Sequence, residues 1–134
     1  MSDHTVRFEL KIPVQQGSAN AIDLLAESCE LSRQQIKQAM SKGAVWLQKG
    51  KRTQRLRRAT KTLNSGEVLR LYYDKRLLDQ IPEAPELLKD FGSYSVWFKP
   101  PGMLAQGTEW GDHCSLLRVS ELAFDKPRQS FLVQ

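Results

Sequence analysis

The side chains best suited to catalysis or metal binding stand together at Asp112-His113-Cys114, where a carboxylate, an imidazole and a thiol follow one another. A nucleophile with its base, or a metal ion, needs such groups to converge on one point, and three adjacent side chains do not usually do so. Asp112 and Ser115 are better suited to shaping a turn before a helix. The two cysteines, Cys29 and Cys114, have no paired-ligand spacing, so neither a disulfide framework nor a metal site is predicted.

Phosphate binding is the chemistry that the charged residues indicate. Between Leu31 and Lys61 the chain has ten Lys or Arg and no Asp or Glu, while the rest of the chain has ten basic and fifteen acidic residues. The formal net charge of +5 is therefore a block of +10 set against a remainder of −5. A face of one sign releases counterions from a phosphate backbone, so nucleic acid is the leading partner. A basic face that serves only solubility is the alternative.

The length of 134 residues, with 40% hydrophobic content, suits one ordinary domain or two small ones. No segment approaches the roughly 20 apolar residues that cross a bilayer. The start, Met1-Ser2-Asp3-His4, has no basic stretch followed by an apolar run. We therefore expect a cytoplasmic protein without a membrane partner.

The first elements predicted are a strand and a helix. Apolar and charged residues alternate over Val6–Ile12, and Pro13 ends this strand. Ser18 or Asn20 can then cap a helix. One face of that helix is apolar at helical spacing and comprises Ile22, Leu25, Ala26 and Cys29.

A second helix begins at Ser32, with Gln35 placed for a capping box and Leu31 and Ile36 for a hydrophobic staple. Gly43 suits the left-handed position that ends it. The predicted core face is Ile36, Ala39 and Met40, and the outer face is Arg33, Gln34, Lys37, Gln38 and Ser41. Two short helices in succession also suggest helix-turn-helix DNA binding.

The next segments argue against a helical DNA-binding bundle. Ala44–Leu47 predicts a strand and Lys49-Gly50 its tight turn, so the module mixes helices and strands. The basic stretch Lys51–Arg58 follows, then a turn at 64–67 and a strand over Val68–Tyr73.

This order of elements resembles the S-four-type RNA-binding module, named after a small-subunit ribosomal protein, over about half of the chain. Three departures are Lys49 where Asn is usual, Glu67 where Asp is usual, and a basic insert from Arg52 to Lys61. The matching segments are Asp23-Leu24-Leu25, Leu31-Ser32-Arg33 through Gly43, Val45-Trp46-Leu47 with Lys49-Gly50, and Gly66-Glu67-Val68.

The resemblance implies binding of structured RNA through its shape and backbone. Trp46 could stack on an unpaired base, but a place in the small core is the expected role. For each charged residue, an ordinary exposed charge is the alternative. The positions expected at RNA are Ser32, Arg33, Gln34, Lys37, Gln38, Lys42, Lys49, Lys51, Arg52, Arg55, Arg57 and Arg58.

The periodicity breaks between Asp74 and Gly92, which predicts a linker with one helical turn. A strand over Tyr94–Phe98 then runs into Lys99, Pro100, Pro101 and Gly102, and a helix is predicted over Ser115–Leu122. This order of a strand, a Lys-Pro-Pro-Gly turn and a helix is similar to the start of a known catalytic domain. It is the catalytic domain of the RNA pseudouridine synthases that act on large-subunit rRNA and tRNA. That class often carries an S-four-type module in front.

The pseudouridine synthase resemblance implies isomerisation of uridine in RNA without metal or cofactor. The catalytic Asp of that family lies in an Arg-Leu-Asp motif after a short apolar strand. Phe131–Val133 is such a strand, but the motif is absent from the chain. The chain is therefore expected to be the N-terminal part of such an enzyme, inactive alone. Lys99 to Gly102 are expected to form a structural motif near the floor of the active site, and a direct catalytic role for Lys99 is the less favoured alternative.

The predicted fold is α+β. Residues 1–75 are expected to form an S-four-like domain of two helices on a small antiparallel sheet, 76–92 a linker, and 93–134 an incomplete β-rich catalytic segment that self-associates. The alternatives are a stand-alone S-four-type protein on ribosomal RNA without catalysis, and a DNA-binding protein that uses Ser32 to Lys42.

Overall fold

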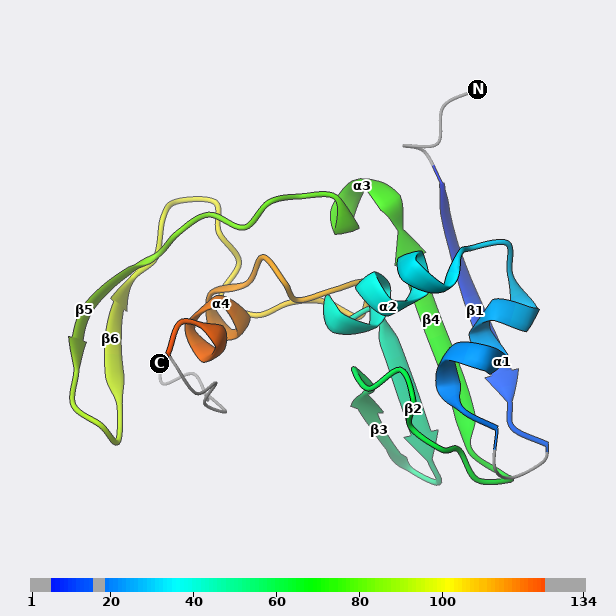
Figure 1. Cartoon of the computed structure of the whole chain (residues 1–134). Coiled ribbons are helices and arrows are strands. Elements are labelled where there is room, and N and C mark those ends of the chain that lie inside the picture. Colours follow the sequence, from blue (N-terminus) through cyan, green and yellow to red (C-terminus); the bar gives the residue numbers. More distant parts are fainter. Residues whose placement is uncertain (1–5, 16–18, 125–134) are drawn as a thin grey trace. The chain divides into compact units, whose positions relative to one another are not determined.

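The computed structural model describes residues 6–15 and 19–124, which form an α+β structure with antiparallel sheets. The chain divides into two units (Figure 1). The first comprises Met1–Asp79 and Glu109–Gly111, and the second Gln80–Thr108 and Asp112–Gln134. The expected strand at Phe131–Val133 lies outside the described residues.

The first unit is built on a four-stranded antiparallel sheet in the order β1-β4-β2-β3. Its strands are β1 (Arg7–Pro13), β2 (Val45–Lys49), β3 (Arg52–Arg55) and β4 (Val68–Asp74). The alternation predicted for the first strand is confirmed, with Pro13 as its last residue. The strand β3 was not predicted, because its sequence Arg-Thr-Gln-Arg has no apolar residue.

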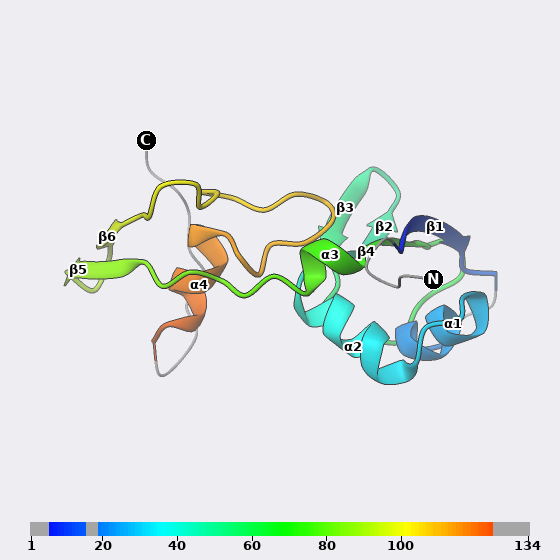
Figure 2. The same ribbon diagram turned by 90° about the horizontal axis from the view of Figure 1, so that it is seen from above.

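Helices α1 (Ala21–Ser28) and α2 (Arg33–Ser41) cover one face of this sheet (Figure 2). Asn20 is the cap of α1, since its side chain accepts from Asp23 N. The capping box predicted for α2 is confirmed, because Gln35 N donates to Ser32 Oγ and Ser32 N donates to Gln35 Oε1. The buried residues of α2 are those predicted, Ile36, Ala39 and Met40.

The core lies between the two helices and the sheet. Alternating residues of β2 and β4 point into it, and Leu47, Leu69 and Leu71 are fully buried. Trp46 does not lie in this core, contrary to the prediction, because Val45 and Leu47 on either side of it face the helices. Gly43 follows α2 with φ at 90°, in the conformation predicted for the end of the helix.

The predicted linker contains more structure than one helical turn. The single turn is α3 (Lys75–Leu78), and a strand, β5 (Glu86–Asp90), follows it. In the second unit β5 pairs with β6 (Ser95–Phe98), the strand that the sequence predicted. The predicted helix is also present as α4 (Leu116–Leu122), with Ser115 as its cap.

Among the described residues, no helix is long and apolar enough to cross a membrane.

Candidate nucleic-acid interface

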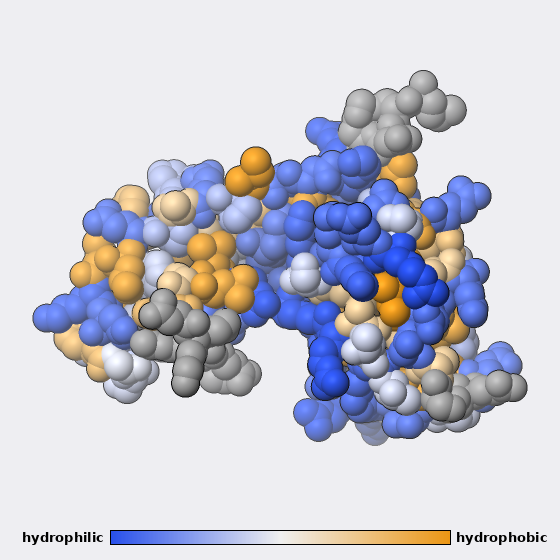
Figure 3. All heavy atoms as spheres, in the orientation of Figure 1, coloured by the Kyte–Doolittle hydropathy of each residue, from blue (hydrophilic) through white to orange (hydrophobic). Residues whose placement is uncertain are grey.

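The outer face of α2 presents polar and basic side chains over the whole length of the helix. Arg33, Gln34, Lys37 and Gln38 are all exposed, and the visible surface over α2 is hydrophilic (Figure 3). The capping box fixes where the helix starts, so these side chains keep a set spacing of three and four residues. Ser32 itself is engaged in the cap, where its hydroxyl accepts from Gln35 N at 3.1 Å.

The first cation of this face is paired with α1. Arg33 Nη1 lies 2.6 Å from Asp23 Oδ1, and both side chains are about half exposed. An exposed pair of this kind contributes about 0–1 kcal/mol to stability. Arg33 therefore remains within reach of a ligand while Asp23 holds it in one orientation.

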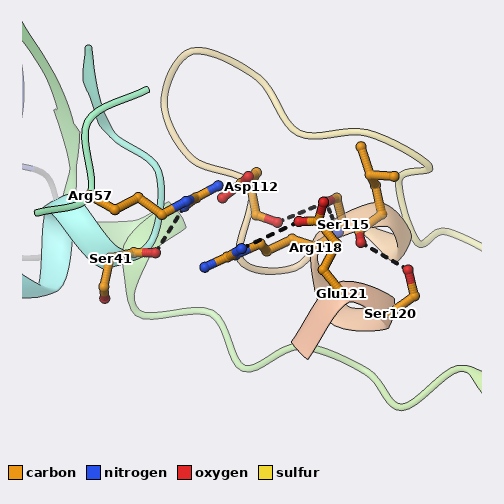
Figure 4. A network of polar contacts seen from close by, with 8 residues as sticks. Ser41, Arg57, Asp112, Ser115, Arg118, Ser120 and Glu121 are labelled. Atoms are coloured by element: carbon orange, nitrogen blue, oxygen red, sulfur yellow. Dashed lines mark hydrogen bonds and ion pairs between the residues drawn. The ribbon is translucent and has the colours of Figure 1, made fainter. Parts of the chain in front are cut away.

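Three of the predicted cations bind backbone carbonyls, two of which lie at the end of α2 and one at the end of α3. Arg57 Nη1 donates to Ser41 O at 3.0 Å (Figure 4), Arg55 donates to Gly43 O, and Lys42 Nζ donates to Leu78 O at 2.7 Å. Ser41 O belongs to the last turn of the helix, where carbonyls lack helical partners and carry partial negative charge. These cations therefore stabilise the fold as well as adding positive potential.

The turn between β2 and β3 carries a second group of cations, Lys49, Lys51 and Arg52. Gly50 has φ at 60°, which makes the tight turn possible. Lys49 Nζ lies 3.5 Å from Glu67 Oε2, and Glu67 is buried and accepts from Asn64 N. The carboxylate of Glu67 thus holds both the loop and Lys49.

The cations that bind carbonyls near the end of α2 and the cations of the β2–β3 turn lie at opposite ends of β2. Five residues of strand separate them by about 15 Å, a distance that fits several nucleotides of a nucleic-acid backbone. Among the cations predicted at RNA, four have exposed side chains that make no hydrogen bond or ion pair with the described part of the chain. They are Lys37, Lys51, Arg52 and Arg58.

Basic residues on the opposite face of the sheet were not predicted at RNA. Lys11 and Arg70 are register partners, and so are Arg70 and Trp46. Partners in an antiparallel pair point to the same side of the sheet. The available signal was the alternation around Arg70, which lies between the apolar Leu69 and Leu71 and must face away from the core.

An apolar groove of about 510 Å³ opens in the first unit, between β1 and the start of α2. Phe8 and Leu10 line one side, and Leu31 and Gln35 line the other. Its charged lining residues are Glu30 and Lys75, one of each sign. The groove therefore offers no charge preference for phosphate.

In the second unit, the Lys-Pro-Pro-Gly segment forms a closed turn. Met103 N donates to Pro100 O at 3.2 Å, Gly102 has φ at 86°, and Lys99 Nζ donates to Met103 O at 2.8 Å. The amine of Lys99 therefore holds its own turn.

The Asp112-His113-Cys114 segment shapes the start of α4, as predicted. Ser115 donates to Asp112 O through both its backbone N and its Oγ, at 2.9 and 2.8 Å (Figure 4). His113 Nε2 lies 2.9 Å from Gln80 O, and Cys114 Sγ lies 3.6 Å from the same oxygen. Over residues 6–15 and 19–124, no group of three His, Cys, Asp or Glu could hold a metal ion.

Searches of family models, curated proteins and solved structures found no match to this chain. The two family resemblances therefore depend on the motifs alone.

Proposed function

We propose that the first unit binds structured RNA, ribosomal or transfer RNA, through the surface formed by α2, the β2–β3 turn and the segment after β3. The observation that carries this proposal is the set of exposed cations without protein partners, Lys37, Lys51, Arg52 and Arg58. A cation without an internal partner loses no protein interaction when it binds a phosphate. The segment from Leu31 to Lys61 contains no acidic residue, so it contributes only positive charge to this surface.

RNA is favoured over duplex DNA by the shape of the surface. Major-groove reading uses a protruding recognition helix, whereas α2 is short and is followed directly by a β-hairpin that carries half of the cations. Helix and hairpin together suit a curved backbone, such as that of a folded RNA. Binding of DNA in the major groove through Ser32 to Lys42 is the rival hypothesis.

The binding test is titration of a fluorescent RNA hairpin at several salt concentrations. The double substitution Lys37→Gln with Arg58→Gln is expected to weaken binding and to reduce the salt slope by about one to two contacts. The matched control is Arg76→Gln with Lys89→Gln, which removes two exposed cations from α3 and β5. An equal loss of affinity in both variants would mean that binding depends only on net charge and not on this surface. A preference for duplex DNA of the same length would favour the rival hypothesis.

We further propose that the chain belongs to an RNA pseudouridine synthase. The support is the order of parts, with a basic α+β unit first and then the β6 strand, the closed Lys99–Gly102 turn and α4. No Arg-Leu-Asp motif occurs in the 134 residues, so tritium release from uridine-labelled RNA by this chain is expected to be absent.

Deletion of the gene in its host is expected to remove at least one pseudouridine from rRNA or tRNA. An unchanged pseudouridine map would instead favour an RNA-binding protein without catalysis, the second reading of the sequence.

A further inference from the structure

The face of the four-stranded sheet opposite α1 and α2 carries one continuous row of side chains. Register pairs Lys11 with Arg70, Arg70 with Trp46, and Trp46 with Arg55, so one residue from each strand lies in the row. Side chains paired in this way share a face. We call these four residues, Lys11, Arg70, Trp46 and Arg55, the sheet row.

The aromatic member of the row is held in a fixed orientation. Trp46 Nε1 donates to Glu109 O at 2.9 Å. The guanidinium of Arg55 lies over the indole, with Cζ 4.3 Å from the ring centroid. Arg55 also donates to Gly43 O, so both planar groups are oriented before any ligand arrives.

The second guanidinium of the row is also oriented. Arg70 Nε and Nη2 both donate to Gln48 Oε1, at 3.3 and 3.0 Å. The amide of Gln48 is in turn oriented by its own donation to Gly50 O at 3.2 Å. Since a guanidinium has five N–H donors, Arg70 keeps three for a ligand.

Aromatic character continues along the same face into the next positions of β4 and β1. Tyr72 packs edge to face with Trp110, at 5.5 Å between ring centroids. Arg7 lies over the ring of Trp110, with Cζ 4.0 Å from its centroid. Among the residues of the four strands, Glu9 and Asp74 are the acidic side chains on this face, and Asp74 is paired with Arg7 at 3.3 Å.

We propose that the sheet row binds unpaired nucleotides of RNA. Oriented guanidinium planes and an indole are the groups on which splayed bases stack, while Lys11 and the remaining donors of Arg70 suit the phosphates between those bases. This surface shares Arg55 with the hairpin but lies on the face of the sheet opposite α2, whose cations suit a folded backbone. The inference extends the proposed RNA binding to a second face and adds single-stranded segments to the RNA that the unit recognises.

The test compares two RNA probes on the full 134-residue chain: a blunt hairpin closed by a stable tetraloop, and the same hairpin with an unpaired extension of eight uridines. The double variant Lys11→Gln with Arg70→Gln is expected to lose roughly fivefold or more in affinity for the extended probe and less than twofold for the blunt one. Lys37→Gln with Arg58→Gln is expected to weaken both probes equally. Arg76→Gln with Lys89→Gln, which also removes two exposed cations, serves as the matched control.

A second measurement, the quenching of tryptophan fluorescence, can be made on the parent chain and therefore does not require the charge variants to fold. Binding of the extended probe is expected to quench tryptophan fluorescence, and Trp46→Phe, which keeps an aromatic ring at that position, should bind the probe but lose most of the quenching.

The inference is overturned if Lys11→Gln with Arg70→Gln binds both probes like the parent chain, or if quenching is unchanged in Trp46→Phe. If the blunt hairpin still binds in that case, the proposed function stands without the sheet row. If neither probe binds the parent chain, both proposals fail.

Discussion

Asp23 on α1 and Arg33 on α2 form an ion pair of 2.6 Å across ten positions of sequence, at the place where the proposed RNA-binding helix begins. Both residues belong to the motif on which the S-four-type resemblance depends. The pair joins the two helices near the loop between them and directs the first cation of α2. It also places a negative charge beside the segment from Leu31 to Lys61, which contains no acidic residue.

Replacing that carboxylate separates its two effects. In Asp23→Asn, the free energy of unfolding is expected to fall by no more than about 1 kcal/mol, because the pair is exposed. Affinity for the RNA hairpin is expected to rise about two- to fivefold at low salt, since a repulsive charge is removed and Arg33 is released. Chemical denaturation and hairpin titration give the two values. Weaker RNA binding with unchanged stability would mean that Asp23 orients Arg33 for its phosphate.

The two units should differ in how much a leucine contributes to stability. Leu71 is fully buried in the core between sheet and helices, whereas Leu88 on β5 is 55% exposed. Leu71→Ala is expected to lower the free energy of unfolding by about 2–5 kcal/mol, and Leu88→Ala by less than about 0.5 kcal/mol. Urea denaturation followed by circular dichroism measures both. A similar loss in the two variants would show that Leu88 is covered in solution.

The exposed apolar side chains of the β5–β6 hairpin lead to a prediction about association. Leu88, Phe91, Tyr94 and Phe98 are each about half exposed, and hydrophobic residues gather on the visible side of the hairpin (Figure 3). A two-stranded hairpin is marginally stable alone, and its open edges invite pairing. We expect concentration-dependent association with a second copy, weakened in Leu88→Lys with Phe98→Lys. Sedimentation velocity that shows only monomer at high concentration would contradict this.

Tyr73 should make the first unit sensitive to alkaline pH. Burial against Phe8 and the core raises the pKa of its phenol above the usual 10.0, and the nearby Lys75 opposes part of this rise. The folded state therefore favours the neutral phenol. Its contribution to stability is fully present below pH 10 and is lost as the pH rises through the higher pKa of the folded state.

Unfolding free energies compared at about pH 9 and pH 11 test this relationship. Tyr73→Phe cannot ionise and is expected to lose less stability over that interval than the parent chain. Tyr94→Phe, at a side chain that is 60% exposed, is the matched control and should behave like the parent. Parallel loss in all three proteins would assign the alkaline transition to other groups.

Local sequence determined the elements whose signals lie within a few residues. The capping box of Ser32 and Gln35, the apolar face of α2 and the alternation in β1 and β4 each need only neighbouring positions, so the helices and most strands could be predicted. The sequence also shows directly which residues are cationic and that they cluster between Leu31 and Lys61. It does not show whether a cation is engaged in the fold, since Arg57 and Lys42 bind carbonyls 16 and 36 positions away.

Tertiary structure alone decided the strands β3 and β5 and the surroundings of the tryptophans. Neither strand has an alternating apolar pattern, and each forms because a neighbouring strand offers unpaired backbone groups. Trp46 was expected in the core, yet strand register turned it to the other face, and the Glu109–Gly111 segment binds it from 63 positions away. The physical reason is the range of the forces: caps and periodicity act within one or two turns of chain, whereas the pairing of strands and the neighbours of a ring depend on segments that only folding brings together.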